Sequence, residues 1–142
     1  MIHYTGTNSA EEAISWLINS RGKEAVSAHL HVAKDGHVVQ LVPFNLKAWH
    51  AGPSEYEGEC GCNLFSIGIE NQGIGDSWPD AQVEANRAII EALCNAYPIE
   101  DVVGHEDICV PVGRKVDPGP KYPWHKVVEY EAPEGTPEEP KE

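Results

Sequence analysis

The stretch SAHLHVAKDGHVVQLVPF, residues 27–44, decides which fold class the sequence predicts. Two arms with strand-forming residues flank Lys34, Asp35 and Gly36, which are typical turn residues, so the stretch predicts a β-hairpin. On both sides of it, segments with strand character and segments with helix character follow one another along the chain. This order predicts an α/β fold, with a β-sheet and helices packed on it.

The residues before the hairpin predict one short strand and one helix. MIHYT (1–5) has strand character, and NSAEEAISWLINSRG (8–22) has the apolar spacing of a helix. Ser9 and Glu12 have the spacing of a capping box at its start, and Gly22 is a typical stop. The expected apolar face consists of Ala13, Ile14, Trp16 and Leu17.

The residues after the hairpin predict a loop, two strands and a second helix. Residues 51–63 have no periodicity, whereas FSIGIEN (65–71) has strand character. DAQVEANRAIIEALCNAY (80–97) predicts a helix capped by Asp80. VVGHEDI (102–108) predicts a strand that runs into a loop, and YPW (122–124) the start of a last short element. The expected apolar face of the second helix consists of Val83, Ala88, Ile89, Ala92, Leu93 and Ala96.

Composition and charge limit the possible functions. The 142 residues are 41% hydrophobic and 23% charged, which is typical of one soluble globular domain. The chain has neither an apolar run of about 18 residues nor a signal peptide at its start, so we expect no membrane partner and a cytoplasmic protein. Its net charge of −13 argues against nucleic-acid partners, because phosphates would be repelled.

The last residues differ in composition from the rest. Residues 129–142 contain six acidic residues, three prolines and almost no apolar side chains. Such a segment cannot bury enough apolar surface to order itself. We therefore expect a folded domain over residues 1–128, followed by an acidic, disordered tail over residues 129–142.

Several side chains are candidate metal ligands. His3, His105 and Asp117 provide two imidazoles and one carboxylate, a set that suits catalytic zinc because a fourth position stays open for water. Two alternatives remain open: His29 and His31 alternate on one strand and would share a face, and Cys109 lies four residues after His105. The four cysteines otherwise predict free thiols, since CGC is too tight for a zinc knuckle; they are Cys60, Cys62, Cys94 and Cys109.

The stretch GRKVDPGP, residues 113–120, sets Lys115 and Asp117 two residues apart in a stiff loop. Pro118 and Pro120 restrict the backbone, and Gly119 permits a sharp bend between them. On this stretch alone, a solvated surface ion pair is the simpler interpretation. A stiff loop is also what a site needs to hold two charged groups in place.

Four blocks of the chain together resemble the zinc-dependent N-acetylmuramoyl-L-alanine amidases, a group that includes muropeptide-recycling amidases, phage lysozyme-type endolysins and peptidoglycan recognition proteins. The blocks are IHYTGT, SAHLHVAKDGHVVQLVPFNLKAWHAG, NLFSIGIEN, and VVGHEDI with GRKVDPGP. The resemblance covers roughly residues 2–124. It implies a single-domain enzyme with a mixed central sheet, one zinc ion, and a peptidoglycan or muropeptide substrate. The alternative is a non-catalytic peptidoglycan-binding module on the same fold.

The resemblance assigns roles to individual residues. The implied zinc ligands are His3, His105 and Asp117. Glu70 matches the catalytic acid/base, and Lys115 matches the group that stabilises charge on the substrate oxygen. His50 matches a histidine that lines the substrate groove, and Trp49 and His29 complete the expected substrate-binding set.

The implied reaction is hydrolysis of the amide between N-acetylmuramic acid and L-alanine, carried out by a monomer. The SIGIEN and RKVDPGP blocks favour a recycling enzyme, whereas the short chain favours a phage enzyme, which would reach the wall with holin-type help. Ala28 stands where phage-type members often have a tyrosine, so the role of that tyrosine is either absent here or taken by Glu70, as in recycling-type members. The sequence leaves polymeric wall and soluble anhydro-muropeptide open as substrates.

Overall fold

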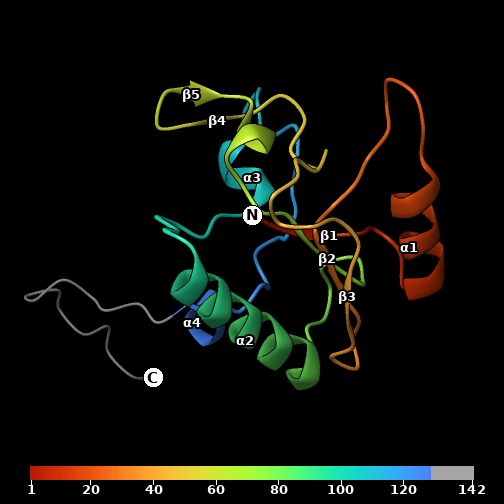
Figure 1. Cartoon of the computed structure of the whole chain (residues 1–142). Helices are drawn as coiled ribbons and strands as arrows, with labels where there is room; N and C mark the ends of the chain where they lie inside the picture. Colours follow the sequence, from red (N-terminus) through yellow and green to blue (C-terminus); the bar gives the residue numbers. More distant parts are fainter. Residues whose placement is uncertain (129–142) are drawn as a thin grey trace, which may run out of the picture.

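A four-stranded mixed sheet forms the centre of the protein (Figure 1). The structure is a computed structural model, and it describes residues 1–128. The sheet order is β1 (Ile2–Tyr4), β6 (Ile69–Asn71), β2 (Leu30–Val32) and β3 (Val38–Gln40). β6 runs parallel to β1 and to β2, while β3 is antiparallel to β2. The predicted α/β fold with a mixed sheet is therefore confirmed.

The predicted hairpin is present as β2 and β3, with Val32 opposite Val38. Its turn is closed by a hydrogen bond from the Ala33 amide to the His37 carbonyl at 2.9 Å. Gly36 has a φ of +88°, and a Cβ added there would lie 2.9 Å from the carbonyl oxygen of Ala81. The turn therefore needs glycine for its backbone conformation and for its close approach to the second helix.

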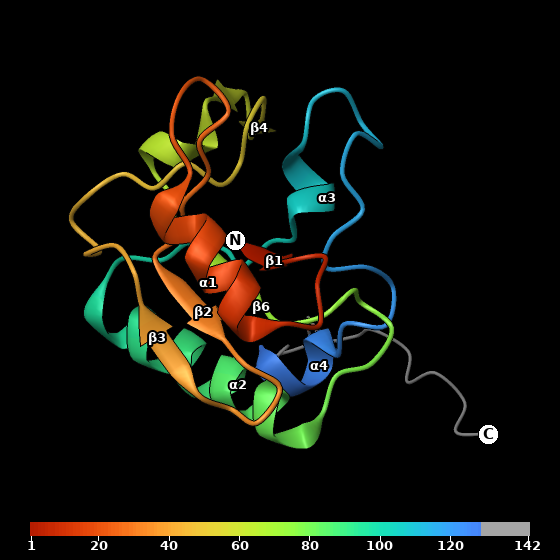
Figure 2. The ribbon, with the colours of Figure 1, turned by 90° about the vertical axis from the view of Figure 1, so that its right-hand side faces the viewer.

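Helices cover both faces of the sheet (Figure 2). Helix α1 (Ala10–Asn19) lies on one face, and α2 (Asp80–Ala96) and α4 (Trp124–Val127) lie on the other. The main core packs on the α2 side and consists of Ile2, Leu30, Val32, Ile69, Val83, Ile90, Tyr122 and Val127. Because successive side chains of a strand point to opposite faces, His3, Glu70 and His31 lie on the α1 side.

Helix α1 confirms the predicted element but corrects three details. The Ser9 hydroxyl accepts a hydrogen bond from the Glu12 amide at 3.2 Å, but the Ser9 amide donates to the Thr7 hydroxyl, so only half of the capping box forms. The helix ends at Asn19, before Gly22. Trp16, expected on the apolar face, is 61% exposed, whereas Ala13 is buried.

Helix α2 has a buried face that the apolar pattern does not predict. Its N-cap is Pro79, and Asp80 is the first helical residue, where its charge still complements the helix dipole. The buried residues are Gln82, Val83, Asn86 and Ile90. The predicted face was wrong for Ala88, Ala92 and Ala96, which are exposed. Buried amides take their place because the sheet offers them hydrogen-bond partners.

A buried polar network joins α2 to the sheet and to the residues before α4. The Asn86 amide donates to Asn71 Oδ1 at 2.7 Å, and the Tyr122 hydroxyl donates to Asn86 Oδ1 at 2.9 Å. Asn71 in turn donates to the carbonyl of His3 at 3.1 Å. The network therefore holds the backbone of β1 at the residue that was predicted to bind metal.

Short elements replace two of the predicted ones. Residues 51–63, predicted as a loop, include the strands β4 (Glu55–Tyr56) and β5 (Glu59–Cys60) and the start of a 3-10 helix, η1 (Cys62–Leu64). Residues 102–108, predicted as a strand, pair with β1 only through a bridge between Gly104 and Ile2. His105 then begins the short helix α3 (His105–Ile108).

Within residues 1–128, no helix has the length and apolar character that a membrane span requires. All four cysteines are free, with Cys62 and Cys109 buried and Cys60 and Cys94 exposed. The tail predicted for residues 129–142 lies outside the described residues.

Candidate metal centre and active site

Three predicted ligands from distant parts of the chain converge beside β1. His3 lies on β1, His105 begins α3, and Asp117 follows in the next loop. His3 Nδ1 lies 3.1 Å from His105 Nδ1 and 3.0 Å from Asp117 Oδ2, and His105 Nδ1 lies 3.2 Å from the same oxygen. All three side chains are buried. Within residues 1–128 they form the one cluster of three or more such groups that could hold a metal ion.

The hydrogen bonds around this cluster fit a cation at its centre. His105 Nε2 lies 2.8 Å from the carbonyl oxygen of Ala51, so this nitrogen carries a proton and leaves Nδ1 to present a lone pair. That lone pair faces His3 Nδ1 and a carboxylate oxygen, an arrangement that is repulsive without a positive charge between them. Tetrahedral zinc at about 2.0–2.1 Å from its ligands would separate them by about 3.3 Å, close to the observed spacing.

The protonation states also fit a metal site. Burial lowers the pKa of His3 to about 4, so the ring is neutral at pH 7. Burial raises the pKa of Asp117, whereas the two imidazoles beside its Oδ2 lower it, and the net effect holds the pKa below its usual value. A neutral imidazole and an ionised carboxylate are the forms in which these side chains bind metals.

His50 contacts His3 through the ring nitrogen that does not face the other two proposed ligands. Its Nδ1 lies 2.9 Å from His3 Nε2, and its Nε2 lies 3.3 Å from the Ser66 hydroxyl. A Cβ on Gly68 would lie 2.5 Å from the His50 ring, so glycine is needed there for the ring to fit. If His3 gives its Nδ1 lone pair to a metal, its Nε2–H donates to His50, which fixes the ring orientation.

Glu70 lies next to the cluster. In the parallel pairing of β1 and β6, it stands opposite His3 and therefore on the same face of the sheet. Burial raises the pKa of its carboxyl well above the usual range, the charge of Asp117 raises it further, and the charge of Lys115 opposes the rise. A carboxylate with a raised pKa beside a cluster of candidate metal ligands suits a proton-transfer role at neutral pH.

The loop that carries Lys115 is fastened to its surroundings at three points. The Lys115 amide lies 3.4 Å from Cys109 Sγ, and the Asp117 carbonyl accepts from the Glu106 amide at 2.9 Å. The guanidinium of Arg114 donates to the carbonyls of Ala51 and Pro53 at 3.1 and 3.0 Å. The exposed Lys115 side chain is thereby carried on a fixed backbone beside the cluster.

A groove of about 1010 Å³ runs over the cluster and brings the predicted catalytic residues together. His3, His50, Glu70, His105, Lys115 and Asp117 all line it. Its other wall is helix α1, which contributes Trp16. The sequence prediction missed Trp16 because a tryptophan at helical spacing was assigned to the core.

Two other predicted substrate contacts lie apart from this groove. The buried His29 accepts a hydrogen bond from the Gly68 amide at 3.0 Å, and its Nε2 lies 2.8 Å from the Leu46 carbonyl. Both ring nitrogens are therefore hydrogen-bonded to the backbone. This also leaves no ring nitrogen of His29 for a metal shared with His31. Trp49 is 54% exposed, with the Lys47 ammonium 3.9 Å above its ring. Substrate contact by His29 and Trp49 stays a prediction.

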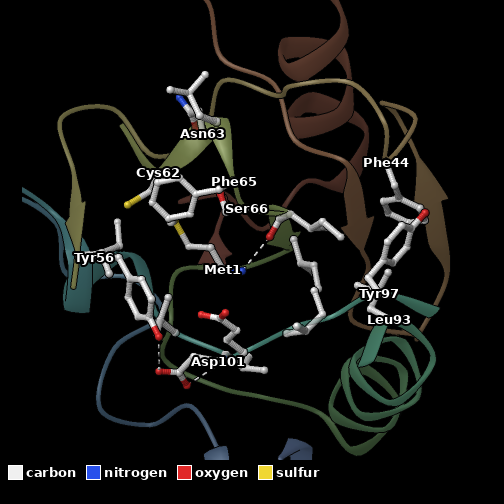
Figure 3. Close-up of a pocket in the computed structure, with 18 of the residues that line it drawn as sticks. Met1, Phe44, Tyr56, Cys62, Asn63, Phe65, Ser66, Leu93, Tyr97 and Asp101 are labelled. Atoms are coloured by element: carbon white, nitrogen blue, oxygen red, sulfur yellow. Dashed lines mark hydrogen bonds between the residues drawn. The ribbon is translucent and has the colours of Figure 1, made fainter. Parts of the chain in front are cut away.

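A second cavity, of about 760 Å³, shares no lining residue with the groove (Figure 3). The Met1 amine lies in it and donates to the Ile67 carbonyl at 2.7 Å. Phe44 and Tyr97 stand edge to face on one side, and the Tyr56 hydroxyl contacts Asp101 on another. The metal-ligand cluster lies outside this cavity, so the groove is the candidate active site.

Comparisons with known proteins identify the family of the chain. A family model described as N-acetylmuramoyl-L-alanine amidase matches residues 1–120. The chain is 46% identical over 102 residues to the 1,6-anhydro-N-acetylmuramyl-L-alanine amidase AmpD of Escherichia coli K12, which covers 70% of this chain and 55% of that protein. The chain thus spans little more than half the length of this relative.

Solved structures give the same result. An AmpD derivative matches with a TM-score of 0.78 and 36% identity, over 89% of this chain and 80% of that chain. The amidase AmiD of Escherichia coli, in complex with anhydro-N-acetylmuramic acid-L-Ala-D-gamma-Glu-L-Lys, matches with a TM-score of 0.79 and 32% identity, over 89% and 54% of the two chains. The match of the family model over most of the sequence shows that this chain belongs to the N-acetylmuramoyl-L-alanine amidase family.

Proposed function

We propose that this protein is a zinc amidase that hydrolyses the amide between N-acetylmuramic acid and L-alanine in soluble anhydro-muropeptides. The observation that carries the proposal is the convergence of His3, His105 and Asp117 with Glu70 and Lys115 in one groove. The identity to AmpD, an amidase named for its anhydro-muramyl substrate, favours the soluble fragment over the polymeric wall.

His3, His105 and Asp117 would hold the zinc ion. When bound, zinc acts as a Lewis acid that polarises the scissile carbonyl and lowers the pKa of a water ligand to about 7. The Nε2–H of His105 donates to the Ala51 carbonyl, and with Nδ1 of His3 on the metal, the Nε2–H of His3 would donate to His50 Nδ1. Both rings are thus fixed in the tautomer that leaves Nδ1 free for the metal.

Glu70 and Lys115 would act on the substrate. Glu70 accepts a proton from the attacking water and delivers it to the nitrogen of L-alanine as the C–N bond breaks. The Lys115 ammonium lies at the same groove and stabilises the negative charge that develops on the carbonyl oxygen. The products are the free lactyl carboxylate of the sugar and a peptide with a free amino terminus.

The test is to measure product formation and zinc content on the same preparations. Wild-type protein should hydrolyse purified anhydro-N-acetylmuramyl-peptide, and Glu70→Gln should lower kcat by about 10²–10⁴ with zinc retained. Lys115→Met should lower kcat by about 10²–10³, also with zinc retained. His105→Ala should lose zinc and activity together.

Two outcomes would contradict the proposal. A wild-type protein that binds the muropeptide but releases no peptide would be the binding module considered above. Faster peptide release from intact sacculi than from the soluble fragment would overturn the substrate assignment and favour the wall-degrading enzyme.

A further inference from the structure

The most unusual buried side chain outside the metal cluster is that of His31. It lies at the middle of β2 with 0% exposure, and none of residues 1–128 supplies a hydrogen-bond partner for either of its ring nitrogens. Burial lowers its pKa, so at neutral pH the ring has one N–H donor and one acceptor. A buried polar group without a partner is costly, so its presence calls for an explanation.

The sheet register places His31 next to the predicted acid/base. Glu70 stands opposite His3 on one side and opposite His31 on the other. Neighbouring strands lie about 4.8 Å apart, so these three side chains form a row on the α1 face of the sheet. Glu70 has the matching deficiency, because its Oε2 is also buried and without a partner among the described residues.

We propose that His31 is a positioning residue for Glu70, with the imidazole N–H donating to one bridging water that in turn donates to Glu70 Oε2. The inference rests on the proposed amidase function. Such a bond leaves Oε1 directed toward the reacting water and fixes the plane of the carboxylate. His31 does not line the groove, so it acts on the reaction through Glu70 and not on the substrate.

Geometry favours this role over simple packing. If His31 only filled space between β2 and α1, an apolar side chain would do so without the cost of burying two ring nitrogens. The apolar side of β2 already faces the main core through Leu30 and Val32. The histidine therefore stands on the one face where a partner of complementary chemistry, Glu70, lies beside it.

The first test compares rates in the zinc-loaded enzyme. His31→Leu should lower kcat by about 10- to 100-fold, with KM and zinc content unchanged, because it removes a hydrogen bond to a charged group. His31→Asn or His31→Gln keeps an N–H donor, and one of the two should restore most of the loss. His37→Leu is the matched control, since His37 is an exposed histidine of the same hairpin, and it should keep the wild-type rate.

A second test does not depend on activity. The free energy of unfolding of zinc-loaded protein is measured for His31→Leu, Glu70→Met and the double variant. Coupling between the two residues should make the double variant less perturbed than the sum of the single effects. Additive effects, together with a wild-type kcat in His31→Leu, would overturn the inference. If the variants show this coupling but the wild-type protein hydrolyses no muropeptide, the proposed function is overturned while the coupling of His31 to Glu70 stands.

Discussion

His105 and Arg114 donate hydrogen bonds to the same oxygen, the carbonyl of Ala51. The distances are 2.8 Å from His105 Nε2 and 3.1 Å from Arg114 Nη2. A Cβ on the adjacent Gly52 would lie 3.1 Å from the same guanidinium, so the chain leaves room for Arg114 at this point. An exposed arginine thus helps to hold the carbonyl oxygen that positions a buried, proposed metal ligand.

Arg114→Gln should therefore weaken zinc binding by up to about 10-fold, the lower end of what outer-sphere substitutions cost. The reason is that the Ala51 carbonyl loses its second donor and holds the His105 ring less firmly. Zinc affinity is measured by competition with a chromogenic chelator. Arg87→Gln is the control, because Arg87 pairs with Glu84 and Glu91 on the surface of α2. Equal zinc affinity in the two variants would show that Arg114 gives the ligand no support.

Trp16→Ala should raise KM for the muropeptide by roughly 5-fold and leave kcat within about twofold. Its exposed ring lines the groove but belongs to the wall opposite the reacting groups, so it should contribute to binding alone. Steady-state kinetics on the anhydro-muropeptide measure both constants. Ile18→Ala changes another exposed apolar residue of α1 and should leave KM unaltered. A wild-type KM in the Trp16 variant would place substrate elsewhere in the groove.

Cys109→Ser should retain zinc and most of the activity, because a serine hydroxyl can also accept the Lys115 amide that now points at Cys109 Sγ. Cys109→Val, of similar size, offers no acceptor and should lower kcat more than Cys109→Ser does. The comparison uses kcat and zinc content of the same samples. Loss of zinc from the serine variant would instead make Cys109 a ligand.

The metal-free protein should lose stability as the pH falls below about 7. Burial lowers the pKa of His3 to about 4, and it also lowers the pKa of His29, His31 and His50. Histidines of the unfolded chain titrate near 6.5. At pH values between the folded and the unfolded pKa, the unfolded chain therefore binds more protons than the folded protein, and the free energy of unfolding decreases as the pH falls.

Urea unfolding in the presence of a chelator, at several pH values between about 5 and 7.5, measures this dependence. A free energy of unfolding that stays constant over this range would contradict the inferred burial of neutral imidazoles.

The hairpin and the clustering of the three proposed ligands could be predicted from the sequence, because the hairpin has a local pattern and the ligands lie in recognisable sequence blocks. Turn residues at 34–36 and strand-forming arms specify β2 and β3 without help from other segments. The positions of His3, His105 and Asp117 came from a resemblance that spans the chain, and the structure brings them within hydrogen-bonding distance.

The rest depends on contacts that no local pattern encodes. Asn86 is buried because Asn71 and Tyr122 supply its hydrogen bonds, so apolar spacing selected the wrong face of α2. Trp16 has the spacing of a core residue, but the groove leaves it exposed. The row of His3, Glu70 and His31 follows from strand order, because β6 enters between β1 and β2 from far along the sequence.

The distance in sequence between the ligands has a consequence for folding kinetics. The contact between His3 and Asp117 joins residues 114 positions apart, and β1 can take its place only beside β6. A partly folded chain therefore cannot assemble the ligand set, and zinc would bind after the long-range contacts form. Zinc should then act mainly by slowing unfolding and should leave the folding rate nearly unchanged. The ion would stabilise the native state after the chain has folded, and it would not nucleate folding.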